Sequence, residues 1–126
     1  KKDYAQAEEY YQKALTLEPN DTANNSYYAL FLLQQGHFEQ AKTFIDKVFQ
    51  HIQPYRNDLE LILWFYRYAC FYQDYPESKS KVESLLQDGI RSPGWPLEGL
   101  LETVKQIVQH PEYDQVAEFA KQISEV

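Results

Sequence analysis

The chain has 126 residues, of which 44% are hydrophobic, 25% charged and 16% aromatic. This length and composition suit one folded domain and exclude a disordered chain. The 12 Lys and Arg against 19 Asp and Glu give a formal net charge of −7, which disfavours contact with the phosphates of nucleic acids and with anionic membranes. We therefore expect no nucleic-acid partner.

Cysteine content and hydropathy narrow the class of protein further. Cys70 is the one cysteine, so the chain has neither an internal disulfide nor a zinc site built from cysteines. That pattern favours a reducing, cytoplasmic location. The longest apolar stretch, residues 59–72, is interrupted by Glu60 and Arg67 and falls short of the roughly 20 apolar residues of a membrane-spanning helix. We therefore expect no membrane partner. The sequence contains no methionine, not even at its start, which indicates a piece of a longer protein.

An internal repeat organises the chain. Residues 2–7 (KDYAQA) align with residues 36–41 (GHFEQA) at an offset of 34, and the pattern returns in residues 73–78 and 111–116. Each copy has an aromatic residue, a small or branched residue three positions later, and then apolar residues four and three positions beyond. This spacing forms one stripe along an α-helix. The repeat therefore predicts helices stacked in pairs.

Further helices are predicted between the copies, and their ends carry capping residues. Asn20 and Asp21 predict the start of a helix that ends at Gly36, a residue that readily adopts the left-handed conformation of helix C-termini. Asn57 with Glu60 predicts a capping box at the start of an aromatic helix. With short connections, we expect about seven antiparallel helices in an all-α, right-handed α-α superhelix.

These residues resemble the tetratricopeptide repeat. The resemblance is carried in the first unit by Asp3, Tyr4, Ala7, Tyr11, Ala14 and Pro19. It implies one solenoid domain over residues 1–126, made of residues 1–21 (the second half of a truncated repeat), 22–54 (a complete repeat), 57–91 (a similar pair) and 96–126 (a degenerate C-terminal pair). Tyr66 stands where the family has a small residue, so the third pair is expected to pack differently.

The sequence has few motifs typical of catalytic or ligand-binding sites. The sequence has no glycine-rich phosphate loop, no Gly-x-Ser-x-Gly elbow and no His-Glu-x-x-His motif. His37, His51 and His110 fall near predicted helix ends, where an imidazole complements the terminal backbone groups. Cys70 lies inside the apolar helix and is expected to act as a small buried hydrophobe. We therefore expect no enzyme, no metal site and no cofactor.

The aromatic helix, residues 59–72, is apolar on nearly every side. Such a helix must be covered all around. One interpretation makes it the central helix of the stack. The other places one of its faces in a groove for a partner, where exposed aromatic residues and arginine are frequent anchors.

The resemblance implies that the first helix of each pair lines a concave surface that binds an extended peptide or a partner helix. By helical spacing, the candidate binding residues are Tyr27, Leu30, Gln34, Trp64, Arg67, Phe71, Glu102 and Lys105. The same faces include Ala23, Glu60 and Glu98. If Trp64 anchors a partner, Trp64→Ala should weaken binding and leave the fold intact.

The function implied by the resemblance is a non-catalytic protein–protein interaction scaffold. The alternative is a regulatory or sensor segment of a larger enzyme, whose catalytic domain lies elsewhere in the parent chain. Self-association through the N-terminal helix is also expected. Its stripe of Tyr4, Ala7, Tyr11 and Ala14 would have packed on an absent helix. One flank can rest on the helix over residues 22–35, while the other, with Tyr10 and Leu15, is left uncovered. Fraying of this helix is the alternative to self-association.

Overall fold

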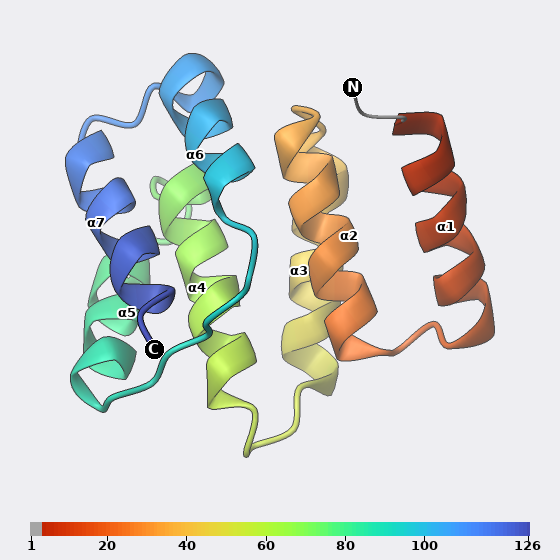
Figure 1. The fold of residues 1–126 in the computed structure, drawn as a ribbon, viewed down its shortest axis with the longest axis horizontal. Helices are drawn as coiled ribbons and strands as arrows, with labels where there is room; N and C mark the ends of the chain where they lie inside the picture. The colour runs from red at the N-terminus through yellow and green to blue at the C-terminus, as the bar shows by residue number, and fades with distance from the viewer. Residues whose placement is uncertain (1–3) are drawn as a thin grey trace.

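The computed structural model describes residues 4–126, which form helices and loops without any strand (Figure 1). In chain order the helices are α1 (Tyr4–Leu17), α2 (Thr22–Gln34), α3 (Phe38–His51), α4 (Asn57–Phe71), α5 (Ser78–Gln87), α6 (Glu98–Thr103) and α7 (Tyr113–Ile123). A π-helical segment, η1 (Val104–Val108), continues α6. The predicted all-α fold of about seven helices is confirmed, whereas the right-handed twist stays a prediction.

The helices pack as antiparallel pairs, α2 with α3 and α4 with α5, and α1 flanks α2 at one end (Figure 1). Two of the predicted helix ends are confirmed. Asp21 caps α2, because its carboxylate accepts the backbone N–H of Asn24 at 2.9 Å. Gly36 follows α2 with φ of +81°, and the next N–H, from His37, donates to the Leu32 carbonyl at 2.9 Å. This left-handed ending turns the chain back into α3.

The predicted capping box at Asn57 is wrong. Asn57 is the first residue of α4, and the preceding cap position belongs to Arg56, whose side chain makes no capping hydrogen bond. The Arg56 guanidinium instead pairs with Asp58, with Nε 3.1 Å from Oδ1. A carboxylate in the first turn also complements the positive end of the helix.

Helix α4 is the central helix of the molecule. It contacts α2, α3, α5, η1 and α7. Its residues without solvent exposure are Leu59, Leu61, Ile62, Leu63, Phe65, Tyr66 and Ala69. An all-round apolar helix is stable in water only with such cover, and the interpretation of this helix as central is confirmed.

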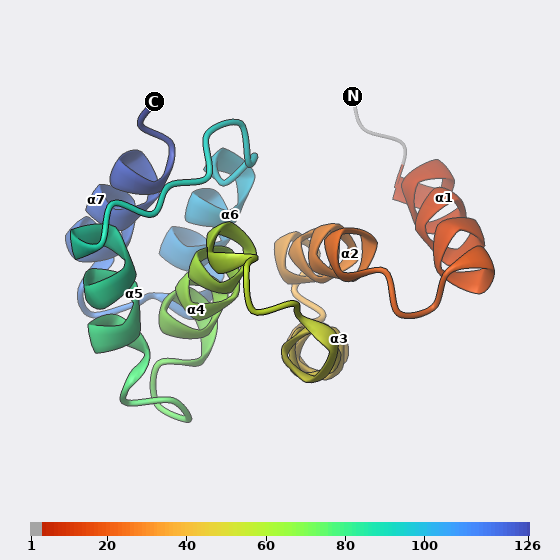
Figure 2. The ribbon, with the colours of Figure 1, turned by 90° about the horizontal axis from the view of Figure 1, so that it is seen from below.

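Helix α6 returns to α2, two pairs back along the chain (Figure 2). Leu100 and Val104 have no exposed surface, which anchors α6 and η1 in the core. We call the side of α2 and α4 that faces α6 and η1 the inner face. Because α6 contacts α2 and η1 contacts α4, the central part of the inner face is filled by the chain itself.

Helix α1 lies at the edge of the fold and has no buried residue. One flank of its stripe packs on α2, as expected, with the Tyr4 and Tyr11 rings 6.2 and 5.6 Å from that of Phe31. Tyr10 is exposed as expected, at 64%, and Leu17 is exposed at 83%. Leu15, which was expected to be uncovered, is instead partly buried and packs against the core. Lys2 and Asp3, which begin the first repeat copy, lie outside the described residues.

Candidate functional site

Three of the predicted binding residues, Tyr27, Leu30 and Gln34, share the side of α2 that faces α6. The Tyr27 ring stacks on Trp95, with centroids 4.2 Å apart and planes 5° apart. A Cβ atom added to Gly99 would come within 2.8 Å of the Gln34 Nε2, so the start of α6 approaches α2 closely. Helix α6 thus forms the second wall of a site that begins on α2.

Between α1, α2 and the start of α6 the surface is hollowed, with a volume of about 310 Å³. Figure 2 shows α1 and α6 on either side of α2. We call this site the α1–α2–α6 hollow. Its lining residues are Tyr11, Tyr27, Leu30, Phe31, Gln34, Pro96, Glu98 and Gly99. The hollow combines aromatic rings, one amide and one carboxylate, a composition typical of sites that hold the side chains of a ligand.

The predicted residues Trp64, Arg67 and Phe71 lie elsewhere, on the side of α4 that meets α3. The Trp64 and Phe49 ring centroids are 5.2 Å apart, and Phe71 meets Phe38 edge-on at 6.3 Å. Trp64 and Phe71 are buried, with exposed fractions of 8% and 7%. These side chains contribute to the packing between α3 and α4 and do not line the hollow.

Arg67 packs its guanidinium against aromatic rings. Its guanidinium lies 4.1 Å from the ring centroids of both Phe49 and Tyr75, and its Nη2 donates to Asp46 Oδ1 at 2.8 Å. An arginine paired and stacked in this way links helices through cation–π contacts and a charge-assisted hydrogen bond. It joins α3 to α4 and to the loop after α4.

Glu102 and Lys105, the remaining predicted residues, are exposed on α6 and η1. Glu102 accepts a hydrogen bond from the Gln106 amide at 3.2 Å, and Lys105 Nζ lies 6.0 Å from the Tyr113 ring centroid. The eight predicted residues are therefore spread over three places. Helical spacing identified the α2 contribution, whereas Tyr11, Phe31, Pro96 and Gly99 were missed because they come from three helices and a loop that only the packing brings together.

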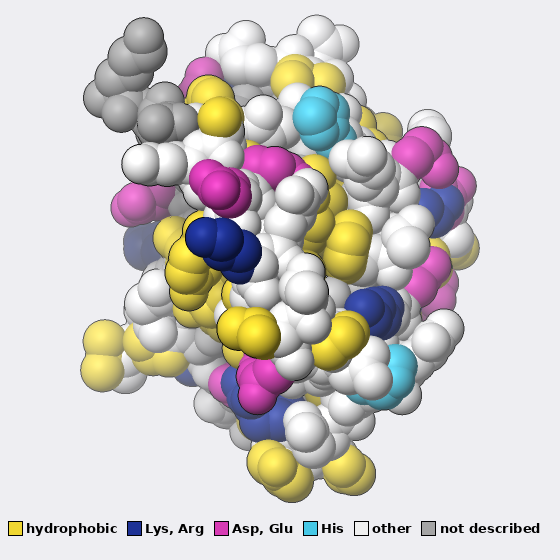
Figure 3. All heavy atoms as spheres, turned by 90° about the vertical axis from the view of Figure 1, so that its right-hand side faces the viewer, with side chains coloured by type: hydrophobic (Ala, Val, Ile, Leu, Met, Phe, Trp, Pro, Cys, Tyr) yellow, Lys and Arg dark blue, Asp and Glu magenta, His cyan; other side chains and the backbone are white. Residues whose placement is uncertain are grey.

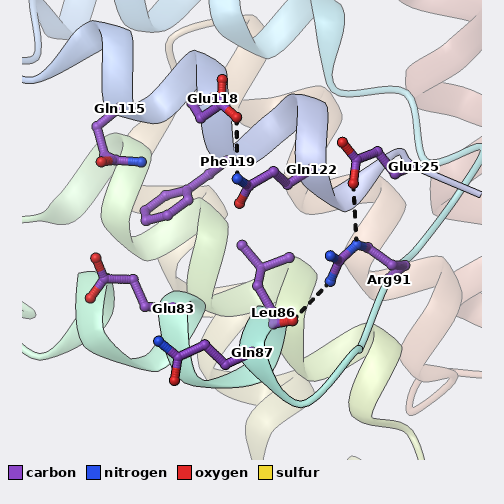
Figure 4. Close-up of a pocket in the computed structure, with 9 residues that line it drawn as sticks. All are labelled: Glu83, Leu86, Gln87, Arg91, Gln115, Glu118, Phe119, Gln122 and Glu125. Carbon is purple, nitrogen blue, oxygen red and sulfur yellow. Dashed lines mark hydrogen bonds and ion pairs between the residues drawn. The ribbon is translucent and has the colours of Figure 1, made fainter.

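A second groove, of about 480 Å³, runs between α5 and α7 (Figure 4). Its polar groups largely pair with one another. Arg91 lies 3.8 Å from Glu125 and donates to the Leu86 carbonyl at 3.0 Å, and Gln122 donates to Glu118 at 3.1 Å. A third hollow, of about 600 Å³, lies between residues 94–101 and α7. In the α5–α7 groove, the polar groups without a partner among the described residues are surface carboxylates and amides, so this groove offers few groups that could select a ligand.

The titratable groups serve the fold. Burial raises the pKa of the Cys70 thiol, so this side chain stays protonated at neutral pH and is a poor nucleophile. The Tyr28 hydroxyl donates to the Glu8 carboxylate, and burial together with that carboxylate raises the pKa of Tyr28 to about 12. Residues 4–126 hold no group of three or more His, Cys, Asp or Glu side chains placed to bind a metal ion.

Within residues 4–126, every helix is too short or too polar to span a lipid bilayer. Comparison with known families matches residues 1–55 to the tetratricopeptide repeat. No curated protein and no solved structure matches the chain. The matched segment contains α1, α2 and α3 and ends before α4 begins. Residues 1–55 therefore belong to the tetratricopeptide-repeat family, whose helical repeats are typically non-catalytic protein-interaction modules.

Proposed function

We propose that the chain is a non-catalytic protein-interaction module that holds side chains of an extended partner segment in the α1–α2–α6 hollow. The observation that carries this proposal is the hollow itself, which places Tyr27 and Gln34 of the family-matched α2 opposite Glu98 and Gly99 of α6. A cytoplasmic location accompanies the proposal, supported by the single cysteine.

The shape of the hollow decides the kind of partner. The inner face is already covered by the chain itself, because α6 contacts α2 and η1 contacts α4, so a whole partner helix does not fit there. A volume of about 310 Å³ is at the lower end of the range for ligand sites. We therefore expect one or two side chains of an extended segment to enter. The walls are helices in contact with the core, so little ordering entropy is lost on the module's side.

The test compares two leucine substitutions on α6. Gly99→Leu places a side chain against Gln34 and inside the hollow, whereas Glu102→Leu adds the same side chain at an exposed position outside its lining. Peptides selected from a random library on the wild-type chain are titrated against both variants by calorimetry. We expect Gly99→Leu to weaken binding by about tenfold or more, the size of a lost central contact, and Glu102→Leu to leave it unchanged.

Equal binding by the wild type and Gly99→Leu would contradict the proposal. Circular dichroism and thermal melting of both variants establish that the helices persist. A partner segment in the same parent chain, as in a regulatory segment of a larger enzyme, would occupy the same hollow. Gly99→Leu would then release that segment to limited proteolysis.

A further inference from the structure

The lining of the α1–α2–α6 hollow contains aromatic rings and one carboxylate without a partner among the described residues, but no positively charged side chain. Tyr11, Tyr27 and Phe31 contribute rings to its lining, and Glu98 contributes the one carboxylate. The described residues form no hydrogen bond or ion pair with the Glu98 side chain. Lys121 lines the neighbouring hollow together with Glu98, yet the two form no ion pair. None of the eight lining residues is basic.

The same combination of a ring and a carboxylate occurs elsewhere in the protein with a cation in place. Lys42 Nζ lies 3.1 Å from Asp74 Oδ2 and 5.7 Å from the Phe71 ring centroid. Arg67 pairs with Asp46 at 2.8 Å and lies 4.1 Å from the Phe49 ring centroid. In both, the cation lies over an aromatic ring while a carboxylate accepts its hydrogen bond, an arrangement with favourable electrostatics.

We infer that the hollow takes a lysine or arginine side chain of the partner segment, with its stem on the rings of Tyr11, Tyr27 and Phe31 and its cation at Glu98. This inference rests on the proposed function and names the chemistry of the partner. The formal net charge of −7 attracts basic segments and repels acidic ones. In this arrangement the rings contact the apolar stem, and the carboxylate favours a positively charged side chain over a neutral one.

The experiment uses two synthetic peptides and two matched variants. Each peptide is an acetylated, amidated heptapeptide with a central residue flanked by leucine and alanine; one carries lysine at the centre and the other carries the neutral isostere norleucine. Binding to the 126-residue chain is followed by NMR through the backbone amides of α2. Glu98→Gln removes the proposed acid, and Glu102→Gln removes an exposed acid one turn further along α6.

We expect the lysine peptide to bind the wild type roughly tenfold more tightly than the norleucine peptide, the size of one partly exposed cation–π and charge-assisted contact. Glu98→Gln should abolish this preference, and Glu102→Gln should retain it. Binding of the lysine peptide should also weaken as salt increases.

Equal affinities of the two peptides for the wild type, with shifts in α2, would overturn the inference and leave the proposed function standing. A preference for lysine that survives in Glu98→Gln would also overturn it, as would lysine-dependent shifts confined to the α5–α7 groove. If neither peptide shifts α2, the inference fails, and the proposed function is decided separately by the Gly99→Leu comparison.

Discussion

Trp64 shows how the surroundings of one residue decide its role. It shares a helical face with Arg67, a spacing that suggested an exposed anchor for a partner. In the structure the indole packs against the Phe49 ring, and the Arg67 guanidinium and the Lys81 ammonium lie 4.9 and 5.7 Å from its ring centroid. Only 8% of its surface is exposed. Its Nε1 is buried and makes no hydrogen bond. The side chain therefore contributes by apolar packing between α3 and α4.

We predict that Trp64→Ala lowers the free energy of unfolding by about 3 kcal/mol, because removing a buried aromatic side chain leaves a cavity. Trp64→Phe should cost less than about half of that, since it keeps a ring and removes a buried N–H without a partner. Urea unfolding of the two variants and the wild type measures both values. A Trp64→Ala chain as stable as the wild type would show that this contact is dispensable.

His110 is held in one neutral form by its hydrogen bonds. Its Nε2 donates to the Tyr68 carbonyl at 3.0 Å, and its Nδ1 accepts the Glu112 backbone N–H at 2.9 Å. The ring also packs on Tyr68 and Tyr72. Burial lowers the pKa of His110, and the nearby positive charge of Lys79 also lowers it. The Tyr68 carbonyl and the Glu112 carboxylate raise this pKa but do not outweigh burial. A second proton, on Nδ1, would break the hydrogen bond that this atom accepts from the Glu112 N–H.

From this lowered pKa we predict that stability falls on mild acidification. The unfolded state, with an ordinary histidine pKa of about 6.5, takes up a proton at a higher pH than the folded state. The contribution of His110 is therefore complete above about pH 6.5 and is lost as pH falls through the folded pKa. NMR titration of His110, with urea unfolding at about pH 7.5 and about pH 5.5, measures the effect. A folded pKa at or above the ordinary value would refute the prediction.

At the scale of elements, α1 is the least covered helix. Tyr11 packs on Tyr28, with ring centroids 5.4 Å apart, while Tyr10 and Leu17 remain exposed on an adjacent face. Figure 3 looks onto this end of the molecule and shows hydrophobic side chains interspersed with charged ones. Exposed apolar strips at the edge of a helical repeat favour association.

We predict that the chain self-associates weakly through α1. Sedimentation velocity should show a weight-average mass that rises above 15.0 kDa as concentration increases. The double variant Tyr10→Lys with Leu17→Lys should stay monomeric. The control, Gln12→Lys with Thr16→Lys, adds the same charge to another exposed face of α1 and should still associate. A wild-type chain that stays monomeric at every concentration would rule out this contact.

The π-helical segment η1 also acts at this scale. The Gln109 N–H donates to the Val104 carbonyl at 2.8 Å, five residues back, which widens the last turn. Gln109 then adopts a left-handed conformation with φ of +54°, uncommon for a residue with a side chain. This sharp ending directs His110 towards α4. A π-helical turn adds one residue to a helix, and here it joins α6 to the loop before α7.

At the scale of the whole molecule, one residue of the loop before α6 connects three elements. Trp95 stacks on Tyr27 of α2, and its Nε1 donates to the Tyr66 hydroxyl at 2.9 Å. That hydroxyl donates in turn to the Ser26 carbonyl at 3.1 Å. A buried chain of hydrogen bonds is stable when every member has a partner. Tyr66, bulky where the family has a small residue, thus links α4 to α2 and to the loop.

The sequence by itself determined the helices. Periodic apolar residues, the Asp21 cap and the Gly36 ending are local features, set by backbone and side-chain chemistry within a few residues. The residues matched to the tetratricopeptide repeat lie where those patterns are clearest. The burial of α4 was also predictable, because a helix apolar on all sides needs cover.

Only the tertiary structure decided which faces meet. A helical stripe defines a face but not the neighbour that covers it, so Trp64 and Tyr27 were equally good candidates for the inner face. Packing turned Trp64 towards α3, while α6 came back to α2 and brought Glu98 opposite Tyr27. The site joins residues more than seventy positions apart along the chain, and such a contact depends on the summed packing of the intervening helices.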